Sequence, residues 1–219
     1  MKKASFTIIL ILFLDQFLKF WVKTNMLYNQ SISVFDDWFY LHFIENPGMA
    51  FGMEYGGEIG KLILSIFRII AVCFLFYGLN RLIKRTAPAG FIVSVSLIIG
   101  GALGNIIDST LYGILFSESS HVKVAEFLPK GNGYAGIFQG RVVDMFYFPL
   151  IEGTYPEWFP FWPNESFVFF RPVFNIADSA ITIGIFIIIF NQKKYFAKEE
   201  EENVKEDEGN GKEKEIEHG

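Results

Sequence analysis

Apolar residues gather in four long runs along the chain. The runs are rich in Ile, Leu, Phe and Val and cover residues 6–22, 62–79, 90–107 and 173–190. The hydrocarbon core of a bilayer is about 30 Å thick, and a helix of roughly 20 apolar residues spans it. The pattern therefore predicts an α-helical integral membrane protein with four transmembrane helices.

The basic residues give these helices an orientation. Lys and Arg flank the runs at positions 2–3, 81–85 and 193–198, and such clusters mark the cytoplasmic side of a membrane. Both termini are therefore expected in the cytoplasm, with residues 23–61 and 108–172 outside, where most of the Trp and Tyr stand. Residues 38–46 favour β-structure and precede Pro47 and Gly48, which predicts a small extracytoplasmic β-rich surface element.

Charge and composition predict an acidic C-terminal tail and give no support for a Cys-rich or zinc protease site. The 219 residues are 51% hydrophobic, and the formal net charge of −5 arises in residues 198–219, whose ten acids and four lysines give −6. This segment has little to bury, so we expect a disordered cytoplasmic tail after a membrane domain of residues 1–197. Cys73 is the single cysteine, and the three histidines form no H-E-x-x-H pattern. A Cys-rich metal site is therefore impossible, and zinc protease chemistry has no support. We expect no cofactor.

Ionisable residues inside the apolar runs are the first candidates for function, because charge is costly in a membrane. Asp15 and Lys19 are four residues apart, so they share a helix face and can offset each other's burial. We interpret them as a structural ion pair. Arg68 is expected either to extend towards the interface or to meet a carboxylate.

Two motifs of the form Asn-Ile-x-Asp end the third run and begin the fourth. They are Asn105 to Asp108 and Asn175 to Asp178. Residues three apart share a helix face, and the two runs have opposite directions, so both motifs are expected near the outer surface. For Asn105 and Asp108, helix capping and polar packing are alternatives to a direct role. They are weaker alternatives for Asp178, since a carboxylate without a partner is costly in an apolar span.

A further carboxylate, Asp144, stands in an apolar stretch just before the fourth run. Two carboxylates close together in a low dielectric cannot both ionise easily, so one keeps its proton while the other acts as a base. Asp144 and Asp178 could thus activate water and protonate a leaving amine. Two unrelated structural aspartates are the alternative. Asn46 is expected either to bind a peptide backbone or to stabilise its own turn.

Five segments in this order resemble the lipoprotein signal peptidase (signal peptidase II) family over most of residues 12–190. They are residues 15–19 (DQFLK), 46–52 (NPGMAFG), 100–108 (GGALGNIID), 142–144 (VVD) and 174–178 (FNIAD). The resemblance implies a membrane aspartyl endopeptidase without metal, which cleaves prolipoproteins before a diacylglyceryl-modified cysteine. It implies an enzyme of the bacterial cytoplasmic (inner) membrane with its active site at the outer face. We expect a monomer whose partners are the lipidated peptide and membrane lipids, with no nucleic acid.

The resemblance also carries roles over to single residues. Asp144 and Asp178 match the catalytic pair. The positions that match a substrate pocket or a support for the pair are Asn46, Asn105, Asp108 and Asn175. Asp15 and Lys19 match a motif that we interpret as mainly structural.

The chain departs from this family in three places. Ser109 follows Asp108 where the family usually has an arginine, and Arg141 or Arg68 could replace that arginine. Residues 110–139 are an insertion that is expected to form a surface lobe. Residues 152–171, rich in aromatic residues and proline, are expected to form an irregular loop at the headgroup level that helps to cover the aspartates.

A transporter or channel is the main alternative function, because carboxylates in membranes often bind protons or ions. Against it, the sequence shows no internal repeat of the kind that transporters have. A membrane protein without chemistry would leave the aspartates in apolar surroundings unexplained.

Overall fold

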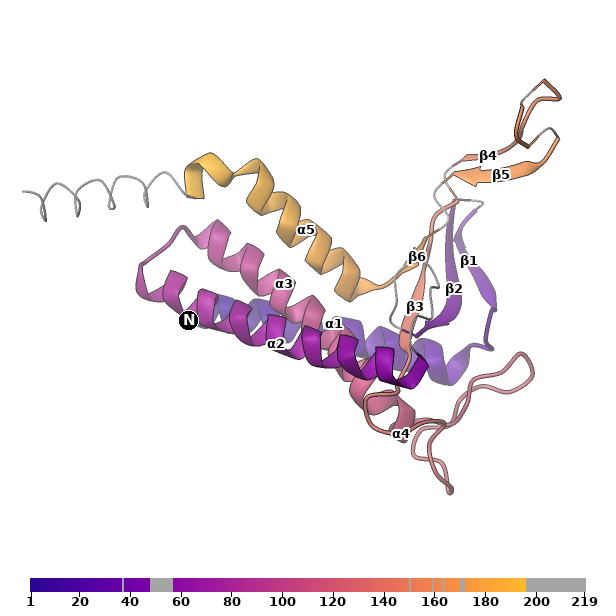
Figure 1. Cartoon of the computed structure of the whole chain (residues 1–219), viewed down its shortest axis with the longest axis horizontal. Coiled ribbons are helices and arrows are strands. Elements are labelled where there is room, and N and C mark those ends of the chain that lie inside the picture. Colours follow the sequence, from indigo (N-terminus) through magenta and orange to yellow (C-terminus); the bar gives the residue numbers. More distant parts are fainter. Residues whose placement is uncertain are drawn as a thin grey trace, which may run out of the picture.

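Helices fill most of the molecule, and a small sheet stands at one end of them (Figure 1). The computed structural model describes residues 1–36, 38–47, 57–149, 151–158, 160–162, 164–169 and 172–195. The long helices are α1 (Lys2–Asn25), α2 (Gly57–Lys84), α3 (Ala89–Ile107) and α5 (Ile176–Phe190). Helix α3 packs against α1, α2 and α5, so it is the centre of the helical part.

Within the described residues, three helices are long and apolar enough to cross a membrane, and they coincide with three of the four predicted spans. They run over Lys2–Asn25, Ile59–Lys84 and Ala89–Leu115. The third continues beyond α3 through the π-helix η2 (Asp108–Tyr112) and the short α4 (Gly113–Leu115). Wider π-helical turns are common at functional sites, and this one begins at Asp108.

The fourth predicted span, residues 173–190, begins too early. Val173–Phe174 is a short strand, β6, and the helix starts only at Ile176. The predicted start of the helix was wrong because a buried strand and a buried helix have similar hydropathy. The 15 residues of α5 rise about 22 Å, less than the roughly 30 Å of a hydrocarbon core.

A four-stranded antiparallel sheet confirms the predicted β-rich element. Its strands are β1 (Ser31–Phe35), β2 (Phe39–Asn46), β3 (Val142–Tyr147) and β6, in the order β1-β2-β3-β6. Asp144 on β3 lies opposite Ile44 on β2, and Phe146 lies opposite Phe174 on β6. The sheet therefore brings Asp144 close to the chain that leads into α5.

Gly140 fixes the start of β3 against η2. A Cβ atom at this position would lie 2.0 Å from the carbonyl oxygen of Asp108, and the Gly140 N–H donates to Ser109 O at 2.9 Å. No side chain fits into so close a contact. The contact brings β3 beside Asp108.

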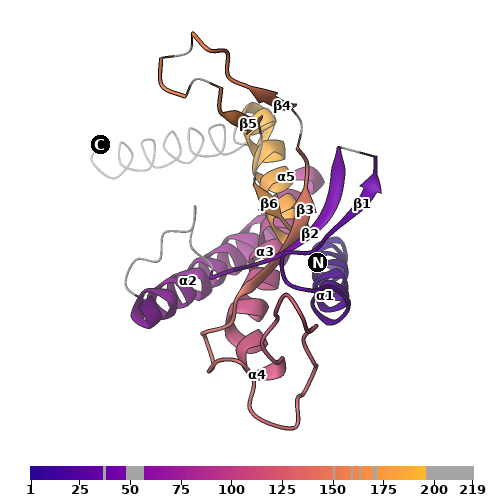
Figure 2. The ribbon, with the colours of Figure 1, turned by 90° about the vertical axis from the view of Figure 1, so that its right-hand side faces the viewer.

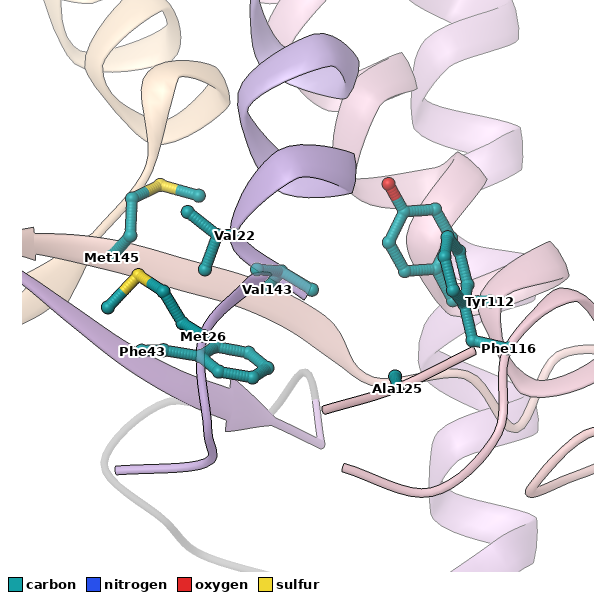
Figure 3. Close-up of a cluster of buried hydrophobic side chains, with 8 residues drawn as sticks. All are labelled: Val22, Met26, Phe43, Tyr112, Phe116, Ala125, Val143 and Met145. Carbon is teal, nitrogen blue, oxygen red and sulfur yellow. The ribbon is translucent and has the colours of Figure 1, made fainter. Parts of the chain in front are cut away.

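The predicted insertion, residues 110–139, differs from a surface lobe at its start, where residues 110–115 continue the third helix through η2 and α4. The remainder packs onto the end of α1 and onto the sheet. Figure 3 shows the buried cluster that joins the three parts. It consists of Val22, Met26, Phe43, Tyr112, Phe116, Ala125, Val143 and Met145. Burial of this apolar surface holds β3, and with it Asp144, against the helices.

The aromatic segment 152–171 is not wholly irregular, contrary to expectation. It contains the antiparallel pair β4 (Ile151–Thr154) and β5 (Ser166–Phe169), which form a separate hairpin beside the main sheet (Figure 2). The described prolines lie between the strands, where no ladder hydrogen bond is needed. The prolines favour the prediction of an irregular loop, and the composition does not predict the short strands on either side of them.

Candidate active site

The start of α5 is held by two reciprocal hydrogen bonds between Asn175 and Asp178. Asn175 Oδ1 accepts from the Asp178 N–H at 2.9 Å, and the Asn175 N–H donates to Asp178 Oδ2 at 3.3 Å. This is a capping box, which satisfies free N–H groups in the first turn of a helix. Asn175 therefore precedes the helix, whereas the spacing in the sequence predicts that it shares a helix face with Asp178.

Asn175 also contacts the second predicted catalytic aspartate. Its Nδ2 donates to Asp144 Oδ1 at 2.7 Å. Asn175 and Asp144 are almost fully buried, whereas Asp178 is half-buried. One amide side chain thus links an enclosed carboxylate on β3 to a more accessible carboxylate on α5.

Asp144 lies in surroundings that favour its protonated form. Burial raises the pKa of Asp144 to about 7, and the negative charge of Asp178 adds to the rise. The positive charge of Lys19 and hydrogen bonds from Asn175 and Asn46 act in the opposite direction but are weaker. At neutral pH this carboxyl is therefore available both as an acid and as a base.

Asn105 on α3 extends the network to α1. Its Nδ2 donates to Asp178 Oδ1 at 2.8 Å, and its Oδ1 accepts from Lys19 Nζ at 2.8 Å. Asn175 Nδ2 is also within 3.3 Å of Asn105 Oδ1. Both predicted Asn-x-x-Asp motifs therefore meet in one hydrogen-bonded group.

Lys19 forms two fully buried ion pairs. Its Nζ lies 2.9 Å from Asp15 Oδ2 and 2.9 Å from Asp108 Oδ2. The two aspartates in turn accept backbone N–H groups, Asp15 from Ala177 at 2.9 Å and Asp108 from Val143 at 3.2 Å. The ion pairs thus connect α1 and η2 to the start of α5 and to the residue before Asp144.

Gln16 belongs to this network and was missed by sequence reasoning. Its Nε2 donates to Asp108 Oδ1 at 2.8 Å and to Asp15 Oδ2 at 3.1 Å, while its Oε1 accepts from the Tyr112 hydroxyl at 3.2 Å. A neutral amide in an apolar run carries the same signal as a charge, because its burial also requires partners. That signal was present in the sequence.

The two candidate arginines have different surroundings. Arg68 Nη1 on α2 donates to Ser109 Oγ at 3.3 Å, and its charge interacts with Asp178, Asp108 and Asp144. Arg141 instead lies 3.2 Å from Glu45 and 2.7 Å from Glu118. Of the two, Arg68 is the one that faces the aspartates.

Arg141 belongs to a second buried ionic cluster, which joins the surface lobe to the rest. Glu45 on β2 is its centre and is paired with Lys23 at the end of α1. Ser119 in the lobe donates to Glu45 Oε1 at 2.7 Å and accepts from Lys23 Nζ at 3.0 Å. The cluster fixes the strand that ends at Asn46.

The predicted site residues therefore lie together. Asp15, Lys19, Asn105, Asp108, Asn175, Asp178, Asp144 and Asn46 form one connected set. Within the described part of the chain, no group of three or more His, Cys, Asp or Glu side chains could hold a metal ion. Within this set Asn175 connects the two carboxyl groups of Asp144 and Asp178.

Comparison with known proteins agrees with the resemblance seen in the sequence. The family model described as signal peptidase (SPase) II matches residues 7–193. A protein of Porphyromonas gingivalis named lipoprotein signal peptidase is 53% identical over 86% of this chain and 81% of its own length. A protein of the same name from Amoebophilus asiaticus is 38% identical over 82% of this chain and 73% of its own length.

A solved structure also matches. It is a bacterial membrane enzyme solved by the in meso method at 2.3 Å resolution, with a TM-score of 0.58 and 25% identity over 89% of each chain. The similarity thus covers the helices and the sheet together. With the family model spanning almost all of the described residues, this chain belongs to the signal peptidase II (lipoprotein signal peptidase) family of bacterial membrane proteases.

Proposed function

We propose that this enzyme is an aspartic endopeptidase that removes the signal peptide of prolipoproteins by cleaving before the diacylglyceryl-modified cysteine, with Asp144 and Asp178 as its catalytic pair. The observation that carries the proposal is the position of Asn175, which hydrogen-bonds to Asp144 through its side chain and to Asp178 through its capping box. A rigid bridge of this kind holds two carboxyl groups in one place, as shared proton chemistry requires.

The surroundings of the pair suggest which aspartate starts as the acid. Asp144 is enclosed, and its pKa is raised to about 7. Asp178 is half-buried and accepts hydrogen bonds from Asn105 Nδ2 and from the Asn175 N–H, donors that stabilise a carboxylate. Asp144 therefore holds the proton at rest and Asp178 is the base.

The reaction follows from these two states. Asp178 takes a proton from a water molecule as the water oxygen attacks the scissile carbonyl carbon, and Asp144 gives its proton to the carbonyl oxygen. Asp178 then passes its proton to the departing amine nitrogen while Asp144 recovers a proton from the tetrahedral intermediate. The products are the carboxyl end of the signal peptide and the free amine of the lipidated cysteine.

The proposal includes an orientation in the membrane. Both termini lie in the cytoplasm, α5 crosses the bilayer as the fourth helix, and the aspartates face the outer leaflet. The support comes from the basic residues at 2–3, 81–85 and 193–194 and from the positive-inside rule. A helix as short as α5 crosses where the bilayer thins locally or flanking residues extend to the interface. The enzyme acts as a monomer among membrane lipids.

The test is cleavage of a diacylglyceryl prolipoprotein by detergent-purified wild type, Asp144→Asn and Asp178→Asn. Each variant keeps the shape of its side chain, and its folding is checked by thermal melting. Glu126→Gln is the control, because Glu126 is an exposed acid in the surface lobe. We expect both Asn variants to be folded and to lose at least about 1,000-fold in kcat, with the control unchanged. Retained activity in either folded Asn variant would overturn the mechanism and favour ion transport as the role of the carboxylates.

A further inference from the structure

The hydrogen-bonded network of the site contains more acidic than basic side chains. Four aspartates are connected in it, Asp15, Asp108, Asp144 and Asp178, and Lys19 is the cation paired with two of them. An ammonium group has three N–H donors. Those of Lys19 are directed to Asp15, Asp108 and Asn105 Oδ1, each 2.8–2.9 Å away. Lys19 therefore has no donor left for the catalytic pair.

Arg68 brings a second positive charge to the site from α2. Its Nη1 donates to Ser109 Oγ at 3.3 Å, and Ser109 Oγ in turn donates to Asn105 O at 2.9 Å. Ser109 is almost fully buried inside η2. The carboxylate whose charge acts most strongly on Arg68 is Asp178, followed by Asp108 and Asp144.

We propose that Arg68 is a positioning residue of the aspartate pair: held by Ser109, whose hydroxyl donates to Asn105 O, its guanidinium provides a positive charge beside the pair that Asn105 and Asn175 connect. This inference rests on the proposed function of the pair. A guanidinium stays protonated over the whole working range of pH, so its effect is constant. It also connects α2 to the site through Ser109.

The effect of Arg68 appears in the pH profile. Other groups facing the pair also carry charge: Lys19 and Asp15 on α1, Asp108 on η2, and, farther along β2, Glu45 with its partners Lys23 and Arg141. All of them are unchanged when Arg68 is replaced. Removal of a nearby positive charge makes a carboxylate hold its proton more tightly. The first loss of a proton from the aspartate pair then moves to higher pH.

The experiment measures kcat/KM against pH with the full-length enzyme in detergent and a diacylglyceryl prolipoprotein substrate. Arg68→Met removes the charge, Arg68→Lys retains it, and the exchange of Arg68→Ser with Ser109→Arg moves it across the 3.3 Å contact. Arg81→Met is the matched control, because it removes a cation from the same helix near its other end. If Arg68→Met does not fold, Arg68→Gln removes the same charge and retains an amide donor for Ser109.

We expect the midpoint of the acidic limb to rise by about one pH unit in Arg68→Met. It should stay near the wild-type value in Arg68→Lys and Arg81→Met and return towards it in the exchange variant. A role limited to helix packing would lower Tm in the Arg68 variants without moving the midpoint, and that result overturns the inference. If the midpoint does not move in Arg68→Met while Asp144→Asn and Asp178→Asn are inactive, the inference about Arg68 is wrong but the proposed function is still supported. Active Asn variants refute the proposed function itself.

Discussion

Lys19→Met provides a direct test of the buried network. The change removes one cation and leaves Asp15, Asp108 and Asn105 without the donor that lies 2.8–2.9 Å from each of them. Lys19 and both aspartates have side chains that are 0% exposed, so water cannot replace the lost contacts. Removal of one partner from a buried ion pair costs about 3–5 kcal/mol.

For a chain of this length the loss corresponds to a drop in Tm of about 6–20 °C, since 1 kcal/mol shifts Tm by about 2–4 °C. The assay is thermal melting in detergent at one fixed scan rate, because the Tm of an irreversible unfolding transition depends on the scan rate. Lys3→Met is the matched control, an exposed lysine at the start of the same helix, and should leave Tm within about 1 °C.

A second substitution separates the ionic explanation from simple loss of packing. Adding Asp108→Asn to Lys19→Met removes one of the two stranded charges and should recover several degrees, although either change alone destabilises. The coupling between the two positions is then positive, as expected for groups in direct contact. A Tm for Lys19→Met within about 2 °C of wild type, or no recovery in the double variant, would refute the view that these charges are held by their pairing.

Three further predictions concern the parts around the network. Glu45→Gln should lower Tm by a similar amount and increase proteolysis in the surface lobe, because buried Lys23 loses its carboxylate; Glu126→Gln, in an exposed ion pair, should not. Gly101→Ala should destabilise by about 1–3 kcal/mol, since its Cβ would lie 2.3 Å from a carbonyl oxygen of α5, whereas the same change at Gly78, where nothing lies within 4 Å, should be neutral or stabilising in thermal melts. Asp144→Asn should raise Tm relative to wild type much more at pH 8 than at about pH 4: the folded-state pKa of Asp144, about 7, exceeds the usual value of about 3.9, so wild-type stability falls as pH rises through this window.

The helices that hydropathy predicted correctly are those that contain the whole of their apolar run. α1, α2 and α3 exceed the length of their apolar runs at one or both ends, so their prediction did not depend on a boundary. The start of α5 did depend on one. Val173 and Phe174 pair with β3, a strand about 30 residues earlier in the sequence, and apolar content alone does not distinguish a strand from a helix there.

The candidate site was predictable in its members and only partly in its connections. Polar residues in apolar runs have to find partners, so Asp15, Lys19, Asp144 and Asp178 could be selected from the sequence, and the same argument should have selected Gln16. Asn175 was selected as a helical residue, yet it acts as a cap that reaches two elements. Such a double contact depends on where β3 passes α5, which no local pattern encodes.

The contact between Arg68 and Ser109 illustrates a second limit. The sequence offered Arg68 and Arg141 as equivalent arginines near the outer surface, and their distance along the chain from Ser109 gives no preference. The packing of α2 against α3 brings Arg68 to the aspartates, while Glu45 and Glu118 bind Arg141. Tertiary contacts, and not distance along the chain, thus decide which arginine lies near the site.

Stability and catalysis are coupled in this protein because the same hydrogen bonds provide both. Asp15 accepts the Ala177 N–H at the start of α5, and Asp108 accepts the Val143 N–H, so the ion pairs of Lys19 fix the backbone directly before each aspartate of the proposed catalytic pair. A substitution at Asp15, Lys19 or Asp108 will therefore reduce total activity even though none of the three has to touch the substrate. Activity per folded molecule separates the two roles: it should fall steeply for Asp144→Asn and Asp178→Asn at unchanged folded fraction. For Lys19→Met the folded fraction itself should fall first as temperature rises.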